Sequence, residues 1–169
     1  MAGDWAGAGG DGVITFELQI PDSLKALLNG QQAAKAVERA VNRTALDARE
    51  MLADGTPKDT GDTARRWAVE LAKFATGRAT ATVFNDSAVA LYLEYGTGIY
   101  SDFPGAPRQV IKPRKARALG PVEWMGESGV FFGEVRGIRP HFIVRSRLTR
   151  IGQMLSENTL RELEGLFGG

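Results

Sequence analysis

The fold is decided by residues 24–52, which read LKALLNGQQAAKAVERAVNRTALDAREML. Their apolar positions recur every three or four residues, the period of a helix with one buried face. We expect an amphipathic helix of roughly 40 Å, at about 1.5 Å per residue. Asp22 or Ser23 is placed to cap its start, and Gly55 and Pro57 end it. The expected stripe consists of Leu27, Leu28, Ala34, Val37, Val41, Ala45, Ala48 and Leu52.

Segments with the alternating pattern of β-strands precede and follow this helix in the sequence. Apolar and polar residues alternate from Ile14 to Ile20, the period of a strand with one buried face. After the helix, Trp67, Val69 and Leu71 occupy alternate positions. A turn at 76–77 then leads to a Thr- and Val-rich run, 79–84. We expect an antiparallel sheet, with the helix packed on the face that carries Trp67, Val69 and Leu71.

The second half of the chain predicts a short helix, a meander and a last helix. Residues 85–87 offer a cap for a helix that runs to Tyr95 and ends at Gly96, followed by a Gly- and Pro-rich loop, 98–107. Strands are expected at 110–119, 122–125 and 130–135, with turns at Gly120-Pro121 and 126–129. Pro140 suits the first turn of a helix whose stripe is Val144, Leu148, Ile151, Leu155, Leu160 and Leu163.

These elements predict an α+β fold, an antiparallel β-sheet packed by a long N-terminal helix and a C-terminal helix. Residues 1–12, rich in Gly and Ala, are expected to form a flexible segment, and residues 13–169 a single domain. No apolar run approaches the roughly 18 residues that span a bilayer, and the start lacks a signal-peptide pattern. We therefore expect no membrane partner and assembly in a cytoplasm.

Catalytic chemistry finds little support in the sequence. The chain has no cysteine, which excludes thiolate nucleophiles and thiolate metal sites. His141 is the single histidine, and its expected place at a helix start is typical of a surface residue. Asp59 and Asp62 lack the remaining oxygen ligands of a calcium loop, and no Gly-rich phosphate loop occurs. We expect no enzyme, no cofactor and no metal site.

Charge is unevenly distributed although the net charge is only +1. Only acids precede Lys25, whereas 103–122 and 136–150 contain bases and no acid. Such patterning suits head-to-tail contact between copies of the chain, while solvated faces, or a basic edge strand that resists sheet pairing, give the same pattern. Residues 108–117 of the first stretch include no aromatic residue to stack on bases, so sequence-specific nucleic-acid binding is not predicted. The candidate subunit interface is Arg108, Lys112, Arg114, Lys115, Arg117, Arg145, Arg147 and Arg150.

Three local motifs occur in a recognisable order. The first is PKDTGDTARR at 57–66, and the second is YLEYGT at 92–97. The third comprises IKPRKARAL at 111–119, GVFF at 129–132 and GIRPHF at 137–142. In this order and spacing, over about residues 24–166, the chain resembles the tail-component family of neck and tail-completion proteins of tailed bacteriophages. The family's recurring positions fall on Pro57, Thr60, Gly61, Tyr92, Glu94, Tyr95, Gly96, Thr97, Arg139, Pro140 and Phe142.

The resemblance implies a structural virion protein that forms a ring, often six-fold, at the head-proximal end of the tail. The implied partners are other copies of the chain, the tail tube protein and the head-tail connector or stopper, with DNA passing through the lumen without specific binding. Thr63 stands where an apolar residue is common, and the insert 101–108 is individual to this chain. A DNA-binding accessory of head-tail assembly and an outer collar protein remain alternatives. Glu94 is interpreted as an interface acid or as an ordinary surface residue.

Overall fold

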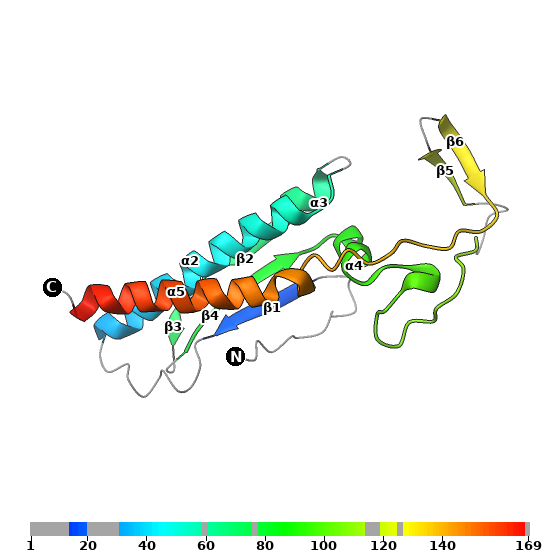
Figure 1. The fold of residues 1–169 in the computed structure, drawn as a ribbon. Helices are drawn as coiled ribbons and strands as arrows, with labels where there is room; N and C mark the ends of the chain where they lie inside the picture. The colour runs from blue at the N-terminus through cyan, green and yellow to red at the C-terminus, as the bar shows by residue number, and fades with distance from the viewer. Residues whose placement is uncertain are drawn as a thin grey trace. The chain divides into compact units, whose positions relative to one another are not determined.

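The computed structural model describes residues 14–19, 31–58, 61–75, 78–113, 119–124 and 127–167. The chain divides into two compact units, unit 1 with Met1–Ala90 and Ile143–Gly169, and unit 2 with Leu91–Phe142. Helices are combined with an antiparallel sheet (Figure 1), which confirms the α+β class. Residues 1–12 lie outside the described residues, and a single domain over 13–169 stays a prediction. The elements are β1 (Ile14–Gln19), α2 (Gln31–Gly55), α3 (Asp62–Arg65), β2 (Trp67–Glu70), β3 (Phe74–Ala75), β4 (Arg78–Asn85), α4 (Ala88–Tyr95), η1 (Gly98–Tyr100), β5 (Leu119–Trp124), β6 (Glu127–Phe132), η2 (Arg145–Arg147) and α5 (Leu148–Phe167).

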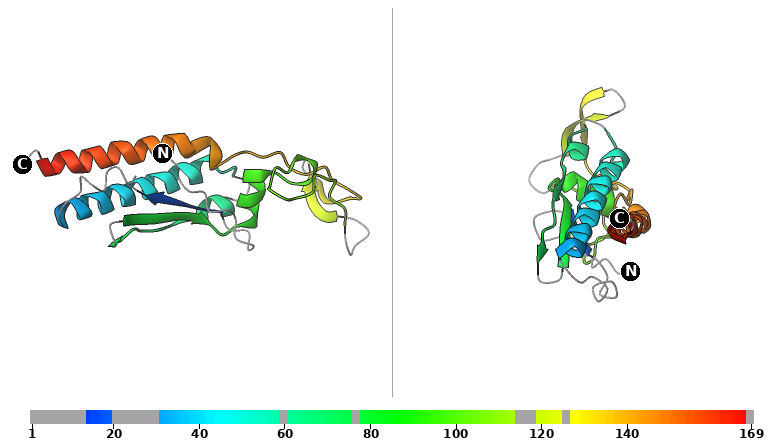
Figure 2. Two further views of the ribbon diagram at one scale, coloured as in Figure 1. Left: turned by 90° about the horizontal axis from the view of Figure 1, so that it is seen from below. Right: turned by 90° about the vertical axis from the view of Figure 1, so that its left-hand side faces the viewer.

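Unit 1 has three layers, with α2 between the sheet and α5 (Figure 2). On one side of α2, Asn42 Nδ2 donates to the carbonyl of Ala72, 3.1 Å away, and its Oδ1 accepts from the N–H of Ala72. On another side, Thr44 Oγ accepts a 3.0 Å bond from Asn158 of α5, and both residues are buried. Because α2 is covered by two layers, its buried positions form a stripe broader than one interface needs. They are Ala33, Ala36, Val37, Ala40, Val41, Thr44, Ala45, Ala48 and Leu52.

The predicted long helix is confirmed from Gln31 to its end at Gly55, while residues 24–30 lie outside the described residues. Val37, Val41, Ala45, Ala48 and Leu52 are buried, as the sequence periodicity predicts. Small residues on α2 let a neighbouring helix approach its backbone closely, since interaxial distance depends on the side chains at the contact.

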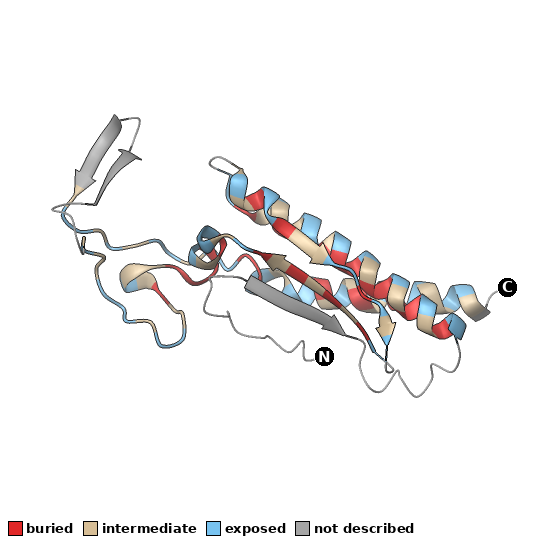
Figure 3. Cartoon of the chain, turned by 180° about the vertical axis from the view of Figure 1, so that it is seen from behind, coloured by how far each residue is buried: buried red, intermediate tan, exposed pale blue. Residues whose placement is uncertain are grey.

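The sheet has β4 at its centre, paired antiparallel with β1 on one side and β2 on the other, and β3 also pairs with β4. Val83 of β4 is opposite Phe16 of β1 and Val69 of β2. Alternate residues of β4 are buried, from Ala79 to Asn85 (Figure 3). The predicted pairing of 67–71 with 79–84 is thus confirmed, but the expectation for Leu71 is wrong. Leu71 is 57% exposed, because β2 ends at Glu70.

Trp67 fastens the sheet to the C-terminal end of α2. Its indole Nε1 donates to Thr56 Oγ1 at 2.9 Å, and that hydroxyl donates to the carbonyl of Leu52 at 2.7 Å. The carbonyl of Trp67 in turn accepts from Arg49 Nε. Trp67, Thr56 and Leu52 are each at most 1% exposed. A buried indole with its N–H satisfied contributes large apolar contact without an unpaired donor.

The C-terminal helix differs from its prediction at its start and on its apolar face. It starts at Leu148, after a 3-10 turn, rather than at Pro140. Residues 141 and 142 cannot open a helix, because the N–H of His141 donates to the carbonyl of Leu93 and Phe142 has φ +51°. Ile151 and Leu155 are buried as expected, but Leu160 is 60% exposed. Asn158 and Thr159 are buried instead, because their side chains bond to Thr44 and to the carbonyl of Leu155.

In unit 2 the predicted meander is reduced to one hairpin. β5 pairs with β6 over 119–124 and 127–132, so Gly120-Pro121 lies inside a strand and not in a turn. The register shifts between Leu119 and Val122, which accommodates a proline that cannot donate to the ladder. The expected turn 126–129 is also wrong, because β6 already begins at Glu127. Of the expected strand 110–119, Ile111 forms an isolated bridge with Val135, and 114–118 lie outside the described residues.

The burial of Val41 gives a direct test of this packing. Val41→Asp is expected to lower the free energy of unfolding by more than about 3 kcal/mol, because a carboxylate is placed in a filled core without a partner. The matched control is Leu160→Asp, at a position on α5 that is 60% exposed. That change is expected to cost less than about 0.5 kcal/mol. Urea unfolding of both variants measures the difference, and similar costs would contradict the assigned burial.

Candidate functional site

The second and third motifs, some forty residues apart in the chain, meet in unit 2. The N–H of Thr97 donates to the carbonyl of Ile138 at 2.8 Å, and the N–H of Ile138 donates to Thr97 Oγ1 at 2.9 Å. The N–H of Ile99 donates to the carbonyl of Arg136, and the N–H of His141 to that of Leu93. We call residues 92–100 together with 136–142 the motif knot. Its hydrogen bonds hold the second motif against the end of the third.

Gly96 and Thr97 have separate physical roles in the motif knot. Gly96 ends α4, as predicted, with φ +71° and its N–H donating to the carbonyl of Tyr92. A Cβ on Gly96 would also lie 2.7 Å from the carbonyl oxygen of Ile138, so a side chain would collide with the opposite segment. Thr97 uses both its backbone N–H and its hydroxyl to hold Ile138. Serine or threonine at this position therefore gives a bond that an apolar residue lacks.

Tyr95 anchors the loop that follows. Its ring meets Phe103 edge to face, with centroids 5.0 Å apart, and its carbonyl accepts from the N–H of Asp102. Ser101 is buried, and its carbonyl accepts from Arg108 Nε at 2.8 Å. The loop 98–107 is thus built into unit 2, and its exposed tip is Pro104 and Gly105. Deletion of 101–106 would remove these contacts and disturb the fold of unit 2.

Glu94 does not occupy the surface position expected of it. The residue is fully buried, so both interpretations of Glu94, interface acid and ordinary surface residue, are wrong. It interacts with other groups of the chain. Acids at the end of a short amphipathic segment are usually solvated, and nothing in the local sequence signals this burial.

Other motif residues of unit 2 are exposed. Tyr92 on α4 is 45% exposed and Phe142 is 40% exposed. The guanidinium of Arg139 lies over the ring of Tyr100, 5.3 Å from its centroid. Pro140 packs near Gly96, since a Cβ built there would meet Pro140 Cδ at 2.9 Å. The motif knot therefore combines a hydrogen-bonded interior with aromatic and cationic side chains on its outside.

The first motif lies in unit 1, at the end of α2 and the start of α3. Pro57 is exposed, and Thr60 lies outside the described residues. Gly61 precedes α3 with φ +77°, which confirms the predicted backbone turn. Asp62 pairs with Arg65 across one turn of α3. Asn85 bonds to the carbonyl of Thr63 at 2.8 Å, which ties the motif to the end of β4.

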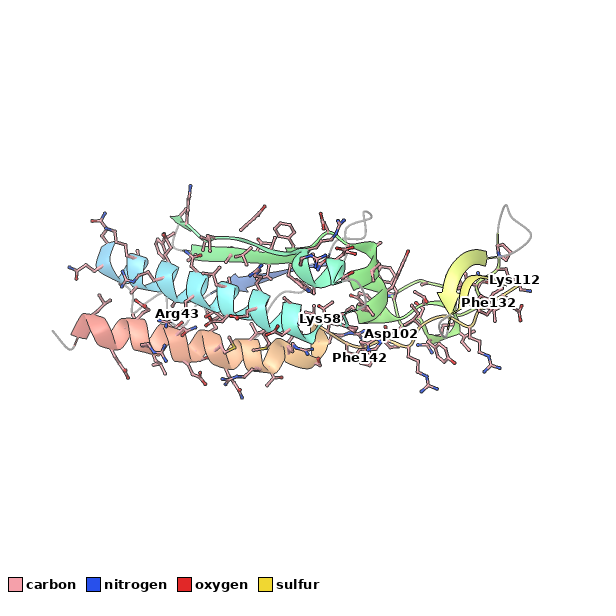
Figure 4. All side chains as sticks on the ribbon, turned by 90° about the horizontal axis from the view of Figure 1, so that it is seen from above. Arg43, Lys58, Asp102, Lys112, Phe132 and Phe142 are labelled. Carbon is pink, nitrogen blue, oxygen red and sulfur yellow. The ribbon has the colours of Figure 1, made fainter. Side chains whose placement is uncertain are left out.

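The predicted interface bases of unit 2 have partners within the chain. Arg108 bonds to the carbonyl of Ser101, and Lys112 lies 3.6 Å from Glu134. Figure 4 shows Lys112 and Phe132 beside the β5–β6 ribbon. Both basic side chains remain exposed, where such ion pairs contribute about 0–1 kcal/mol. Arg114, Lys115 and Arg117 lie outside the described residues.

The predicted interface bases of unit 1 differ in their exposure. Arg145 and Arg150 are exposed, and Arg150 pairs with Glu157 at 3.3 Å. Arg147 is half-buried, because its guanidinium covers Gly55 at the end of α2 and donates to the carbonyl of Ile143. A cation in this place complements the helix dipole. Arg147 therefore stabilises unit 1, whatever other contacts it makes.

His141 is exposed and engaged through its backbone N–H with Leu93. Among the described residues, no three His, Asp or Glu side chains gather as metal ligands would. None of the described helices has the length and apolar character needed to cross a membrane.

Comparison with known proteins gives one match. Residues 19–96 match the family model HK97-gp10_like, described as "Bacteriophage HK97-gp10, putative tail-component". The matched segment runs from the end of β1 through α2, the sheet and α4, so it contains the first motif and nearly all of the second. No curated protein and no solved structure matches the chain.

The close approach within the motif knot predicts different effects for two glycines that both have positive φ. Gly98→Ala is expected to cost at least about 3 kcal/mol, because the new Cβ would lie 2.1 Å from the carbonyl oxygen of Arg136. Gly105→Ala is the matched control, since its φ is +80° and a Cβ there meets nothing within 4 Å. It should cost only the left-handed penalty of about 1–2 kcal/mol. Urea unfolding and amide exchange of Ile99 measure both, and equal costs would show that the two segments are not in contact.

Proposed function

Because residues 19–96 match the model of the HK97-gp10-like family of bacteriophage tail components, we propose that the chain forms an oligomeric ring at the head-proximal end of the tail. This ring completes the tail and joins it to the head connector. The match of residues 19–96 to a family of phage tail components supports the proposal, including a place in the virion. The role is structural, with no enzymatic step.

The physical need for such a ring follows from the way a tail tube is built. Identical rings stacked head to tail form a heterologous assembly that has no intrinsic end. A ring with one face that matches the tube and another that matches the connector stops growth and creates the joint. Symmetry multiplies many modest contacts, so no single contact needs to be tight.

The proposed partners are other copies of the chain in a six-fold ring, the tail tube protein, and the connector or stopper of the head. DNA passes through the lumen without specific binding. A net charge of +1 supports this last point, since attraction to phosphates grows with basic excess. Lys112 and Arg150 already have acidic neighbours, which reduces their pull on a polyanion.

Contacts with neighbouring copies are proposed for the exposed interface bases, and contacts with the adjoining ring are proposed for the loop tip. Arg108, Lys112, Arg145 and Arg150 are exposed in the structure. Pro104 and Gly105 project at the tip of a loop that Tyr95 and Phe103 hold in place. A loop held at its base and exposed at its tip is suited to contact a partner without large ordering cost.

The proposal predicts the phenotype of a phage that lacks this protein. We expect DNA-filled heads and separate tails that fail to join, because the tube has no ring to present to the connector. Electron microscopy of lysates shows the particles, and supply of the full chain from a plasmid should restore joined virions. Normal infectious particles without the protein would remove the completion role and favour an accessory or collar protein.

A separate measurement tests whether the chain forms a ring. The mass of the purified full chain, determined by native mass spectrometry or light scattering, should be a multiple of 18.2 kDa, with six copies for a six-fold ring. A label on the chain should then appear at the head-proximal end of the tail in images of the particle. A label along the whole tube would contradict a terminal position.

A further inference from the structure

Two described surfaces of the chain complement each other in charge and in apolar character. The first is on the outside of the motif knot in unit 2. Four large apolar side chains with at least 37% exposure come from the two segments of the motif knot, although single exposed apolar residues are usually scattered. Arg136 and Arg139 are exposed beside them. The apolar residues are Tyr92, Ile99, Ile138 and Phe142.

The backbone conformation of Phe142 is a second, independent indication that this surface contacts a partner. Its φ of +51° is the one positive value among the described residues other than glycine. An aromatic residue in the left-handed region costs about 1–2 kcal/mol, and such strain clusters at functional positions. The segment before it is fixed by the bonds of His141 to Leu93 and of Ile138 to Thr97. The motif knot thus holds a partly exposed phenyl ring in a conformation that it would not adopt alone.

The second surface is the solvent-facing stripe of α2 in unit 1. Leu46, Glu50 and Asp54 are spaced by four residues, so they lie on one face of the helix, and all three are exposed. The half-buried Asp47 lies beside them, and the exposed Arg43 lies one turn before Leu46 on the same face. Asp47 and Glu50 form no ion pair with any residue that the structure describes, while Asp54 lies 3.7 Å from Lys58. We call Leu46, Asp47, Glu50 and Asp54 the acidic stripe.

We propose that the outside of the motif knot of one copy docks on the acidic stripe of the next copy. Phe142 and its apolar neighbours cover Leu46, and Arg136 and Arg139 face Asp47 and Glu50. The charges on the two surfaces are opposite, which favours this pairing and opposes contact between two like surfaces. Because each chain carries one surface of each kind, the contact is heterologous and closes into a ring when its rotation allows. This inference rests on the proposed ring and names the contact that builds it.

A charge swap tests the contact in the full chain. Arg139→Glu and Glu50→Arg are each expected to raise the dissociation constant of the assembly by about 10-fold or more at low salt, and less at high salt. The double variant restores the opposite charges and should return to within about 3-fold of the parent. Arg161→Glu, a reversal of an exposed base on α5, is the matched control and should have no such effect. Light scattering over a dilution series gives the constants, and thermal unfolding checks that each monomer is folded.

The apolar part of the contact has its own pair of variants. Leu46→Ser should weaken assembly by about 10-fold. Leu160→Ser changes a leucine on α5 that is at least as exposed, and it should leave assembly unchanged. Neither side chain is needed in the core, so folding is preserved in both. If the parent assembles and the reversals at 139 and 50 change nothing, or the double variant is not restored, this contact is overturned and the ring proposal stands. A parent chain that remains monomeric would overturn both.

Discussion

The burial of α2 on two sides is the constraint on which unit 1 depends. One side of this helix meets the sheet and another meets α5, so its buried positions include both branched residues such as Val41 and small ones such as Ala36 and Ala40. The Trp67 indole, bonded to Thr56 at the end of the helix, fixes the sheet on one side. The buried bond between Asn158 and Thr44 fixes α5 on the other. A buried polar pair costs free energy unless both partners are present, so it favours one register of the two helices over others.

The sequence predicted the elements whose signal is local and periodic. The three- and four-residue spacing from Val37 to Leu52 gave the long helix, and alternation around Trp67 and Val83 gave the paired strands. It failed where neighbours distant in the chain decide the outcome. Leu71 was predicted to lie in the core because it continues the alternating apolar positions of Trp67 and Val69. It is exposed, and β2 ends one residue earlier. Pro140 looked like a helix start, but a backbone bond from His141 to Leu93 holds that segment in another conformation.

The candidate site was also predicted only where its signal is local. The motifs at 92–97 and 137–142 were recognised as separate stretches, and nothing in their spacing indicated that Thr97 bonds to Ile138 in both directions. Glu94 was expected at the surface, because a carboxylate is rarely buried, and the structure buries it fully. The exposed apolar group around Phe142 could not be read from the sequence either. Its members come from α4, from the turn after it and from a segment some forty residues later.

The division of unit 1 into two stretches also sets an order of events during synthesis. Unit 2 is one continuous stretch, Leu91–Phe142, whereas the core of unit 1 needs residues on both sides of it. The hydroxyl of Thr44 donates to the carbonyl of Ala40 within α2, but the bond that it accepts from Asn158 forms only when that residue, 114 positions later, has been made. On the ribosome, unit 2 is therefore complete while α2 still lacks its second covering layer. Until α5 emerges, α2 exposes an apolar side, and this is the interval in which a nascent chain is most open to chaperones and to aggregation.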